Sequence, residues 1–168
     1  MKAPRFSRLN SPLGMLCLVT DGPLLLGLDF DDGRARLLSL LERQLNLVAM
    51  EEGPAPAPVA AALEAYFAGA LDALASLQVT LGGTTFQREV WQALREIPPG
   101  STRSYGALAA QLGKPAAARA VGLANGANPV ALVLPCHRVI GSDGTLTGYA
   151  GGLARKQWLL AHEGALLL

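Results

Sequence analysis

Hydrophobic positions in the first half of the chain follow two periods, one typical of strands and one typical of helices. Two apolar runs, Leu13–Thr20 and Leu24–Phe30, are separated by Asp21-Gly22, a pair that favours the tight turn of a β-hairpin. Leucines then recur every three or four residues, which predicts an amphipathic helix over Arg34–Leu45, and a second helix is predicted over Val59–Leu74. This half is therefore expected to form a small α/β unit.

The second half begins after Gly82-Gly83 and carries shorter apolar segments. Helices are predicted over four segments, which are Thr85 (as the N-cap) to about Glu96, Tyr105–Leu112, Ala116–Asn125 and Leu153–Glu163. A turn containing Gly113 joins the two middle helices, as in a helix-turn-helix. Short strands are predicted here over Val130–Leu134 and Val139–Ile140, whereas Gln78–Leu81 is predicted as a last short strand of the first half. Helices with a small β-wing indicate a winged helix.

Composition narrows the class of protein. The chain has 168 residues, of which 51% are hydrophobic and 16% charged, so it can build a core as one large domain or two small ones. No apolar run approaches the roughly 18 residues of a membrane span, and the start lacks the apolar stretch of a signal peptide. Two cysteines, Cys17 and Cys136, provide neither a disulfide framework nor a zinc site by themselves. We expect a reducing, cytoplasmic location without a membrane partner.

Charge is unevenly distributed along the chain. Up to Leu81 there are six basic and nine acidic residues, whereas from Gly82 on there are eight basic and four acidic ones. The basic second half suggests an anionic partner there. An excess of this size is also common in proteins that bind no nucleic acid, so charge alone leaves the question open.

The predicted helix over Ala116–Asn125 has few side chains that read DNA bases. Arg119 is its only long polar side chain before Asn125, and alanine and glycine fill most other positions. Such a helix reads sequence poorly, because base edges in the major groove are read by several Arg, Asn or Gln side chains. Its short side chains suit close docking in a minor groove, with Arg119 as the one side chain that reaches into the duplex. The alternative is a buried, alanine-rich helix with Arg119 in a surface ion pair.

Pro135-Cys136-His137-Arg138 is the strongest candidate for chemistry. A cysteine thiolate is a good nucleophile, and a neighbouring histidine or basic group favours its formation. Consecutive residues on a strand point to opposite faces, so Cys136 and His137 need a bridging water or a kink after Pro135 to cooperate. Glu163 is a plausible group to orient the histidine. The alternative is an inert buried thiol.

These residues resemble the O6-alkylguanine-DNA alkyltransferase family. The resemblance rests on the Pro135–Ile140 string, on Arg119-Ala-Val-Gly122 before it and on Gly148-Tyr149-Ala150-Gly151-Gly152-Leu153 after it. Further matches are Phe86, Val90-Trp91, Ile97-Pro98, Gly100, Ser104-Tyr105, Leu108-Ala109, Asn128-Pro129, Trp158 and His162-Glu163-Gly164. The match is dense from about residue 84 to 165, and in the N-terminal half it extends to length and layout only.

The resemblance implies a fold and a reaction. Residues 1–81 would form a ribonuclease-H-like α/β support domain, and residues 82–168 a winged-helix domain with the active-site cysteine. The protein would bind double-stranded DNA in the minor groove without reading sequence, and we expect a monomer because nothing in the sequence suggests a dimer seam. It would flip out an O6-alkylguanine and move the alkyl group irreversibly to its cysteine. Alkyl transfer to a thiolate needs no cofactor. The structural zinc of some relatives needs several ligands, and the N-terminal half offers only Cys17 and no histidine, so we expect no metal.

Roles in catalysis carry over by matching residues. Cys136 matches the alkyl acceptor, His137 the base that acts through a water, and Glu163 the acid that orients this base. Tyr105 matches the tyrosine that hydrogen-bonds the flipped base and favours guanine as leaving group. Asn128 matches the asparagine that braces the two halves of the domain around the active-site strand.

Substrate and DNA contacts carry over in the same way. The carbonyls of Cys136 and Val139 match those that receive the exocyclic amine of the base, and Tyr149 and Ala150 lie in the loop over it. Many relatives carry serine at position 150, but a backbone N–H makes this contact, so we expect little loss. Arg119 matches the arginine that fills the gap in the duplex. The other expected DNA contacts are Ala120, Gly122, Lys114 and Ser142.

Three alternatives remain open from the sequence. Alkyltransferase-like damage sensors share the fold but lack the cysteine. A winged-helix transcription factor with an incidental cysteine should carry several base-reading side chains on its recognition helix. A cysteine hydrolase would turn over repeatedly, and no acyl or peptide pocket is evident. Preference between alkylated guanine and O4-alkylthymine is not set by these residues.

Overall fold

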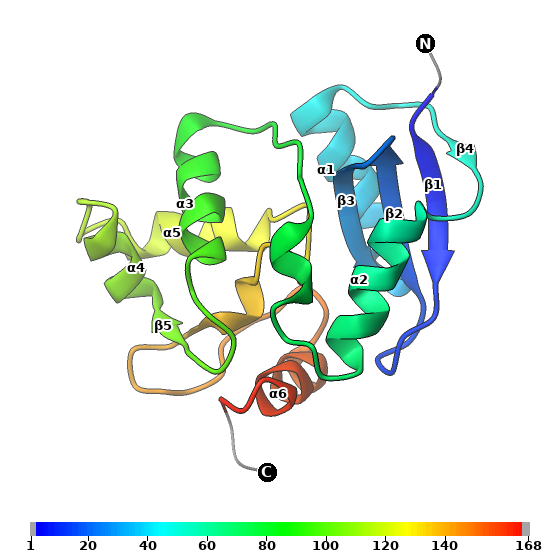
Figure 1. Cartoon of the computed structure of the whole chain (residues 1–168). Coiled ribbons are helices and arrows are strands. Elements are labelled where there is room, and N and C mark those ends of the chain that lie inside the picture. Colours follow the sequence, from blue (N-terminus) through cyan, green and yellow to red (C-terminus); the bar gives the residue numbers. More distant parts are fainter. Residues whose placement is uncertain (1–2, 166–168) are drawn as a thin grey trace. The chain divides into compact units, whose positions relative to one another are not determined.

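The computed structural model describes residues 3–165, and its chain divides into two compact units (Figure 1). The first unit takes the chain up to Gly83 together with Pro129–Val133, and the second takes Thr84–Asn128 and the chain from Leu134 on. The short returning segment is held by backbone hydrogen bonds. Leu28 N–H donates to the Pro129 carbonyl at 3.0 Å, and Ala131 N–H donates to the Leu28 carbonyl at 2.9 Å.

A four-stranded sheet forms the base of the first unit. Its strands are β1 (Arg5–Leu9), β2 (Leu16–Asp21), β3 (Leu24–Phe30) and β4 (Glu51–Glu52), in the order β3-β2-β1-β4. The β1–β2 and β2–β3 pairs are antiparallel, and β4 lies parallel to β1. Gly22 has a φ of +56° in the β2–β3 turn, so the predicted hairpin is confirmed.

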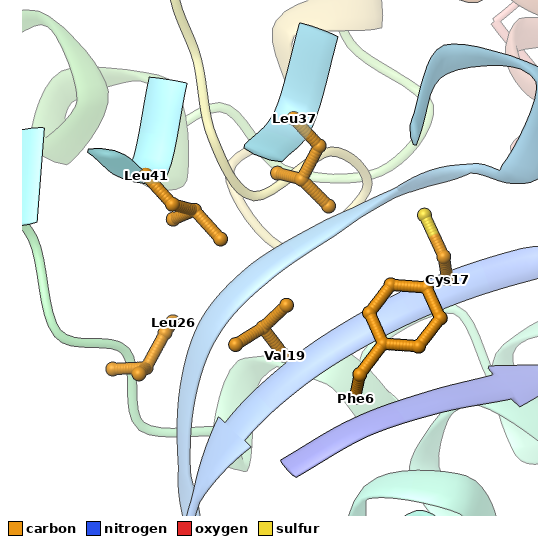
Figure 2. Packing of buried hydrophobic residues seen from close by; sticks show 6 residues of the cluster. All are labelled: Phe6, Cys17, Val19, Leu26, Leu37 and Leu41. Carbon is orange, nitrogen blue, oxygen red and sulfur yellow. The ribbon is translucent and has the colours of Figure 1, made fainter. Parts of the chain in front are cut away.

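Helix α1 (Arg34–Leu45) packs on this sheet with the bounds that the leucine pattern predicts. Figure 2 shows Leu37 and Leu41 of the helix facing Phe6, Val19 and Leu26 of the strands. A Cβ on Gly27 would lie 3.0 Å from a methyl group of each of the two leucines, so the glycine lets the helix approach closely. Cys17 is fully buried in the same cluster.

Other predicted elements of this unit differ from the structure. Helix α2 (Ala57–Phe67) ends before Gly69, whose φ is +114°, and the short 3-10 helix η2 (Ala73–Ser76) overlaps only the last two residues of the predicted span. Strand β1 was not expected, because its polar and apolar residues alternate too weakly to signal a strand. The segment predicted as a last strand makes a single bridge, between Val79 and Leu25.

Gly82 lies so close to the backbone of Gln44 that replacing it by alanine should destabilise the fold. A Cβ at this position would overlap the backbone carbonyl oxygen of Gln44, so the Gly82→Ala chain must shift its backbone. We expect the free energy of unfolding to fall by about 1–3 kcal/mol, measured by urea denaturation. Gly106→Ala is the matched control, because a Cβ there meets nothing within 4 Å. A Gly82→Ala protein as stable as the control would contradict this packing.

The described part of the second unit contains four α-helices and a small sheet. Their bounds are α3 (Thr85–Arg95), α4 (Tyr105–Gln111), α5 (Ala118–Gly126) and α6 (Leu153–His162), and strand β5 (Arg103–Ser104) lies parallel to β6 (Val139–Ile140). A capping box at Thr84, one residue before the predicted cap, starts α3. Trp91 is fully buried and donates through Nε1 to the Ala124 carbonyl at 2.8 Å, which ties α3 to α5.

Helices α4 and α5 are joined through Gly113, which has a φ of +73°, in agreement with the predicted helix-turn-helix. Ser104 caps α4 as predicted, through a hydrogen bond from the Ala107 N–H at 3.0 Å. Helix α5 begins two residues later than predicted, since Lys114–Ala117 form a turn closed by a 2.9 Å backbone hydrogen bond.

The strand predicted over Val130–Leu134 is wrong. This segment is fully buried but forms consecutive turns, and its pairing is limited to a single bridge between Val130 and Leu28. Leu132 has a φ of +71°, which an extended strand does not allow. A short apolar run marks burial, and burial alone does not distinguish a strand from a buried turn. Within residues 3–165 no helix is long and apolar enough to cross a bilayer.

Candidate active site

Cys136 lies at the start of a short 3-10 helix, η3 (Cys136–Arg138), directly after Pro135. Cys136 is 6% exposed, and its backbone N–H donates to the Leu134 carbonyl at 2.7 Å. The backbone therefore turns at the cysteine instead of continuing as a strand. This is the kink after Pro135 that cooperation between Cys136 and His137 requires.

His137 and Arg138 both bind the carboxylate of Glu163, which caps the C-terminus of α6. His137 Nε2 lies 2.8 Å from Glu163 Oε2, and Arg138 binds both carboxylate oxygens at 2.8 Å through Nε and Nη2. Arg138 Nη1 also donates to the Ile97 carbonyl at 2.6 Å. All three side chains are buried, so both oxygens of this carboxylate are held by the two residues that follow the cysteine. The histidine–glutamate contact is the one the sequence suggested, whereas the role of Arg138 was missed.

The pKa values in this network fix its protonation. Burial alone would raise the pKa of Glu163, but hydrogen bonds from Arg138 and His137 outweigh it and lower the pKa to about 2. Burial lowers the pKa of His137 below its usual value, although Glu163 opposes the shift. At neutral pH the histidine is therefore neutral and the glutamate charged.

The tautomer of His137 follows from this protonation. A carboxylate only accepts, so Nε2 carries the proton and donates it to Glu163. Nδ1 is left with its lone pair, and it is buried with no hydrogen-bond partner among residues 3–165. The ring therefore presents a base on the side away from the glutamate.

Two asparagines hold the backbone on either side of Pro135. Asn128 Nδ2 donates to the Leu134 carbonyl at 2.8 Å, and Asn125 Nδ2 donates to the Cys136 carbonyl at 3.4 Å. Both side chains are buried. Asn128 was predicted to brace this segment, whereas Asn125 was read only as the end of its helix. The backbone at Cys136 is thus held by one side chain of α5 and by one that follows this helix.

Lys156 of α6 is fully buried and was also missed. Its Nζ donates to the Val139 carbonyl at 2.6 Å and to the Thr147 carbonyl at 2.9 Å. Burial lowers the pKa of this lysine, and attraction to Cys136 opposes the shift. The Thr147 hydroxyl in turn donates to the Tyr105 hydroxyl at 3.2 Å. The loop after β6 is therefore fastened to both the lysine and the tyrosine.

The remaining predicted substrate residues lie around this centre to different degrees. The Tyr149 ring stands edge-on to the His137 ring, with centroids 6.5 Å apart. Ala150 is exposed in the same loop, and Val139 is buried. A Cβ on Gly122 of α5 would lie 3.8 Å from the Tyr105 ring, so this glycine leaves room beside the tyrosine.

The predicted DNA contacts fall on exposed parts of the second unit. Arg119 and Ala120 lie on the exposed face of α5, and the structure records no ion pair between Arg119 and another described residue. Lys114 lies over the Phe86 ring at 4.9 Å and 3.8 Å from Glu89. Ser142 is exposed in the turn after β6 and shares no contact with this α5 face that the structure records.

Metal-binding side chains do not gather in the described part of the chain. No group of three or more His, Cys, Asp or Glu residues is placed there to hold an ion. Both cysteines are free thiols.

Both halves of the chain match domain models of one known protein family. Residues 5–81 match the model of the 6-O-methylguanine DNA methyltransferase ribonuclease-like domain, and residues 85–165 match that of the DNA binding domain of the same family. The methylated-DNA–protein-cysteine methyltransferase of Salmonella typhimurium is 52% identical over 164 residues, which is 96% of each chain. That of Mycobacterium bovis is 45% identical over 94% of this chain and 91% of its own.

Solved structures agree with this placement. The crystal structure of Mycobacterium tuberculosis OGT in complex with DNA has a TM-score of 0.82 at 44% identity, covering 96% of this chain and 93% of its own. An O6-methylguanine-DNA methyltransferase of Pyrococcus kodakaraensis has a TM-score of 0.73 at 27% identity, covering 96% and 99%. The predicted two-domain α/β architecture is confirmed. The chain belongs to the 6-O-methylguanine DNA methyltransferase family.

Proposed function

We propose that this protein repairs DNA by transferring the alkyl group of O6-alkylguanine to Sγ of Cys136, once per molecule. The observation that carries the proposal is the buried Arg138–Glu163–His137 network, which leaves a free base at Nδ1 of the histidine that directly follows Cys136 in the chain. The curated relatives bear the name methylated-DNA–protein-cysteine methyltransferase, which describes the same chemistry.

The geometry supports a definite order of proton and bond changes. The Cys136 thiol proton passes through a water to His137 Nδ1, and the Glu163 charge stabilises the imidazolium that forms. The thiolate then attacks the alkyl carbon, a C–S bond forms, and the C–O6 bond breaks with its electrons going to the guanine. The guanine takes up one proton and regains its N1–H, which balances the proton that the thiol gave up. The Tyr105 hydroxyl hydrogen-bonds the base and favours its departure. A thioether is stable, so the cysteine is consumed.

Stoichiometry tests this proposal. A duplex with one O6-methylguanine is mixed with increasing amounts of protein, and restored guanine is measured by nucleoside chromatography. The expected result is one guanine restored per protein molecule, with no further repair on longer incubation. Repeated turnover would point to a hydrolase, and lesion binding without repair would point to a damage sensor.

DNA docking is assigned to the exposed face of α5. This face carries Arg119, the small residues Ala120 and Gly126, and an exposed Leu123, so it offers one long polar side chain and reads few bases in a minor groove. Flipping a base costs a few kcal/mol, least for a weakened pair, so an alkylated guanine is selected through its poor pairing. Arg119 offsets part of the cost by filling the gap in the stack. The duplex is therefore bound without regard to sequence.

Replacing Arg119 should slow repair of duplex DNA much more than reaction with a free base. We expect Arg119→Ala to lower the rate on an O6-methylguanine duplex by about tenfold or more, since the flipped state loses its filler. The rate with free O6-benzylguanine should stay within about twofold. Arg43→Ala, at an exposed arginine of α1, is the control. Equal losses on duplex and free base would assign Arg119 to the reaction centre.

The remaining assignments concern the roles of the two domains, the cellular location and the oligomeric state. We assign the support role to residues 1–81 and the chemistry to residues 82–168, and we place the protein in the cytoplasm as a monomer. The reaction needs a reduced thiol, and Cys136 is a free one. Sedimentation with and without a lesion duplex checks the monomer.

A further inference from the structure

Asn125 carries a buried acceptor atom for which the chain provides no donor. The residue is 7% exposed in the last turn of α5, and its Nδ2 donates to the Cys136 carbonyl at 3.4 Å. A carbonyl only accepts, so the nitrogen of the amide faces Cys136 and the orientation of the side chain is fixed. Oδ1 is buried without a hydrogen-bond partner among the described residues. Folded proteins rarely leave such an atom unpaired without a functional reason.

The position of Asn125 on α5 points to a ligand. It lies three residues after Gly122, so the two residues are neighbours on one face of the helix. Gly122 faces the Tyr105 ring, and Asn125 itself contacts the Cys136 backbone. Asn125 therefore shares a helix face with the glycine beside Tyr105, and its amide nitrogen reaches the backbone of Cys136. The tyrosine and the cysteine are the two residues assigned to the flipped base.

The backbone acceptors nearby already have donors inside the protein. The resemblance assigns the exocyclic 2-amino group of guanine to the carbonyls of Cys136 and Val139. Lys156 Nζ donates to the Val139 carbonyl at 2.6 Å, and Asn125 Nδ2 donates to the Cys136 carbonyl. An amino group brings two N–H donors. Asn125 Oδ1 is the acceptor in this group that has no donor of its own.

We propose that Asn125 is a specificity residue, whose Oδ1 accepts a hydrogen bond from the 2-amino group of the flipped O6-alkylguanine. This inference rests on the proposed alkyl transfer. It gives the site a preference for guanine over O4-alkylthymine, which carries no amino group to fill this acceptor. A site built to bind an N–H group rejects an analogue that lacks it, because the buried acceptor is then left unpaired.

The test compares rates on matched duplexes that carry O6-methylguanine, O6-methylhypoxanthine or O4-methylthymine. The hypoxanthine base differs from the guanine only by the missing 2-amino group. For the wild-type protein we expect the guanine duplex to react roughly three- to tenfold faster than the hypoxanthine duplex. Asn125→Leu removes the acceptor at similar volume and should bring this ratio close to one. The preference over O4-methylthymine should shrink in the same variant.

Two further variants separate this effect from damage to the cysteine. Asn125→Asp keeps an acceptor oxygen and should keep the preference for guanine, whatever it does to both rates. Asn10→Leu makes the same change at an exposed asparagine of the first unit and should leave the ratio as in the wild type. Because each ratio is taken within one protein, a general loss of reactivity cancels.

The outcomes distinguish this inference from the proposed function. If the wild-type protein transfers no alkyl group, the proposed function fails. If it does transfer but Asn125→Leu keeps the wild-type guanine-to-hypoxanthine ratio, the inference is overturned, and the oxygen serves a bound water or the fold alone. A wild-type ratio near one overturns it as well.

Discussion

Replacing Cys136 by serine is expected to abolish alkyl transfer while the protein still binds a lesion duplex within a few fold of the wild-type affinity. The hydroxyl is a far weaker nucleophile than the thiolate at neutral pH, whereas the DNA contacts assigned to α5 are untouched. Repair is followed by nucleoside chromatography and binding by fluorescence anisotropy. The expected loss is complete within the detection limit, the largest effect of any single change.

Cys17→Ala is the matched control for this substitution. Burial, followed by the charges of Asp29 and Asp31, raises the pKa of Cys17 to about 12, so this thiol stays protonated at neutral pH. The variant should repair one lesion per molecule like the wild type. If alkyl transfer persisted in Cys136→Ser and vanished in Cys17→Ala, the acceptor would be Cys17, and the assignment of Cys136 would be wrong.

Replacing Glu163 by glutamine is expected to slow alkyl transfer by about a hundredfold or more and to destabilise the fold. The amide no longer stabilises the imidazolium of His137, and general-base catalysis contributes about 10²–10⁴-fold. It also leaves the buried Arg138 guanidinium without its counter-charge. Breaking a buried ion pair by removing one partner costs about 3–5 kcal/mol in unfolding free energy. Single-turnover kinetics and urea denaturation measure the two losses.

The pH dependence of the unfolding free energy tests whether the charge of Glu163 stabilises the fold. Glu163 has a folded pKa of about 2, below its ordinary value of 4.5, so its contribution is present above pH 4.5 and is lost as the pH falls toward 2. The lowered pKa of His137 acts in the same direction, because its contribution is lost as the pH falls below 6.5. Glu163→Gln should remove the part of the decline between pH 4.5 and 2 that Glu163 contributes and leave the part that His137 contributes.

Glu64→Gln provides the control for this pH series, since Glu64 is exposed on α2. It should keep the wild-type pH profile, with a change in unfolding free energy within about 0.5 kcal/mol. An acid decline of wild-type size in Glu163→Gln would mean that another carboxylate governs acid stability.

Local sequence patterns account for much of the backbone. Leucine spacing gives both ends of α1, and Asp21-Gly22 gives the turn before β3. The same reasoning fails at Val130–Leu134, where uniform burial resembles a strand although Leu132 adopts a positive φ. Turns of this kind are fixed by tertiary contacts, such as the hydrogen bonds to Leu28, and leave no periodic trace.

The site was predicted from sequence in part. The structure brings His137 and Glu163 together as expected, although they are 26 residues apart. The roles of Arg138, Lys156 and Asn125 were missed, because basic and amide side chains in a sequence normally indicate surface. Their burial depends on carbonyls and a carboxylate supplied by distant segments. Arg138 lies within the Pro135–Arg138 motif, and this position was the one signal in the sequence that pointed to a role for it.

Intact-protein mass spectrometry after mixing with a duplex that contains one O6-methylguanine tests the central claim most directly. The proposal predicts a single gain of one CH₂, located by fragmentation on the peptide that contains Cys136 and absent from Cys136→Ser. Lesion binding without any gain in mass, or a gain located on another residue, would contradict it.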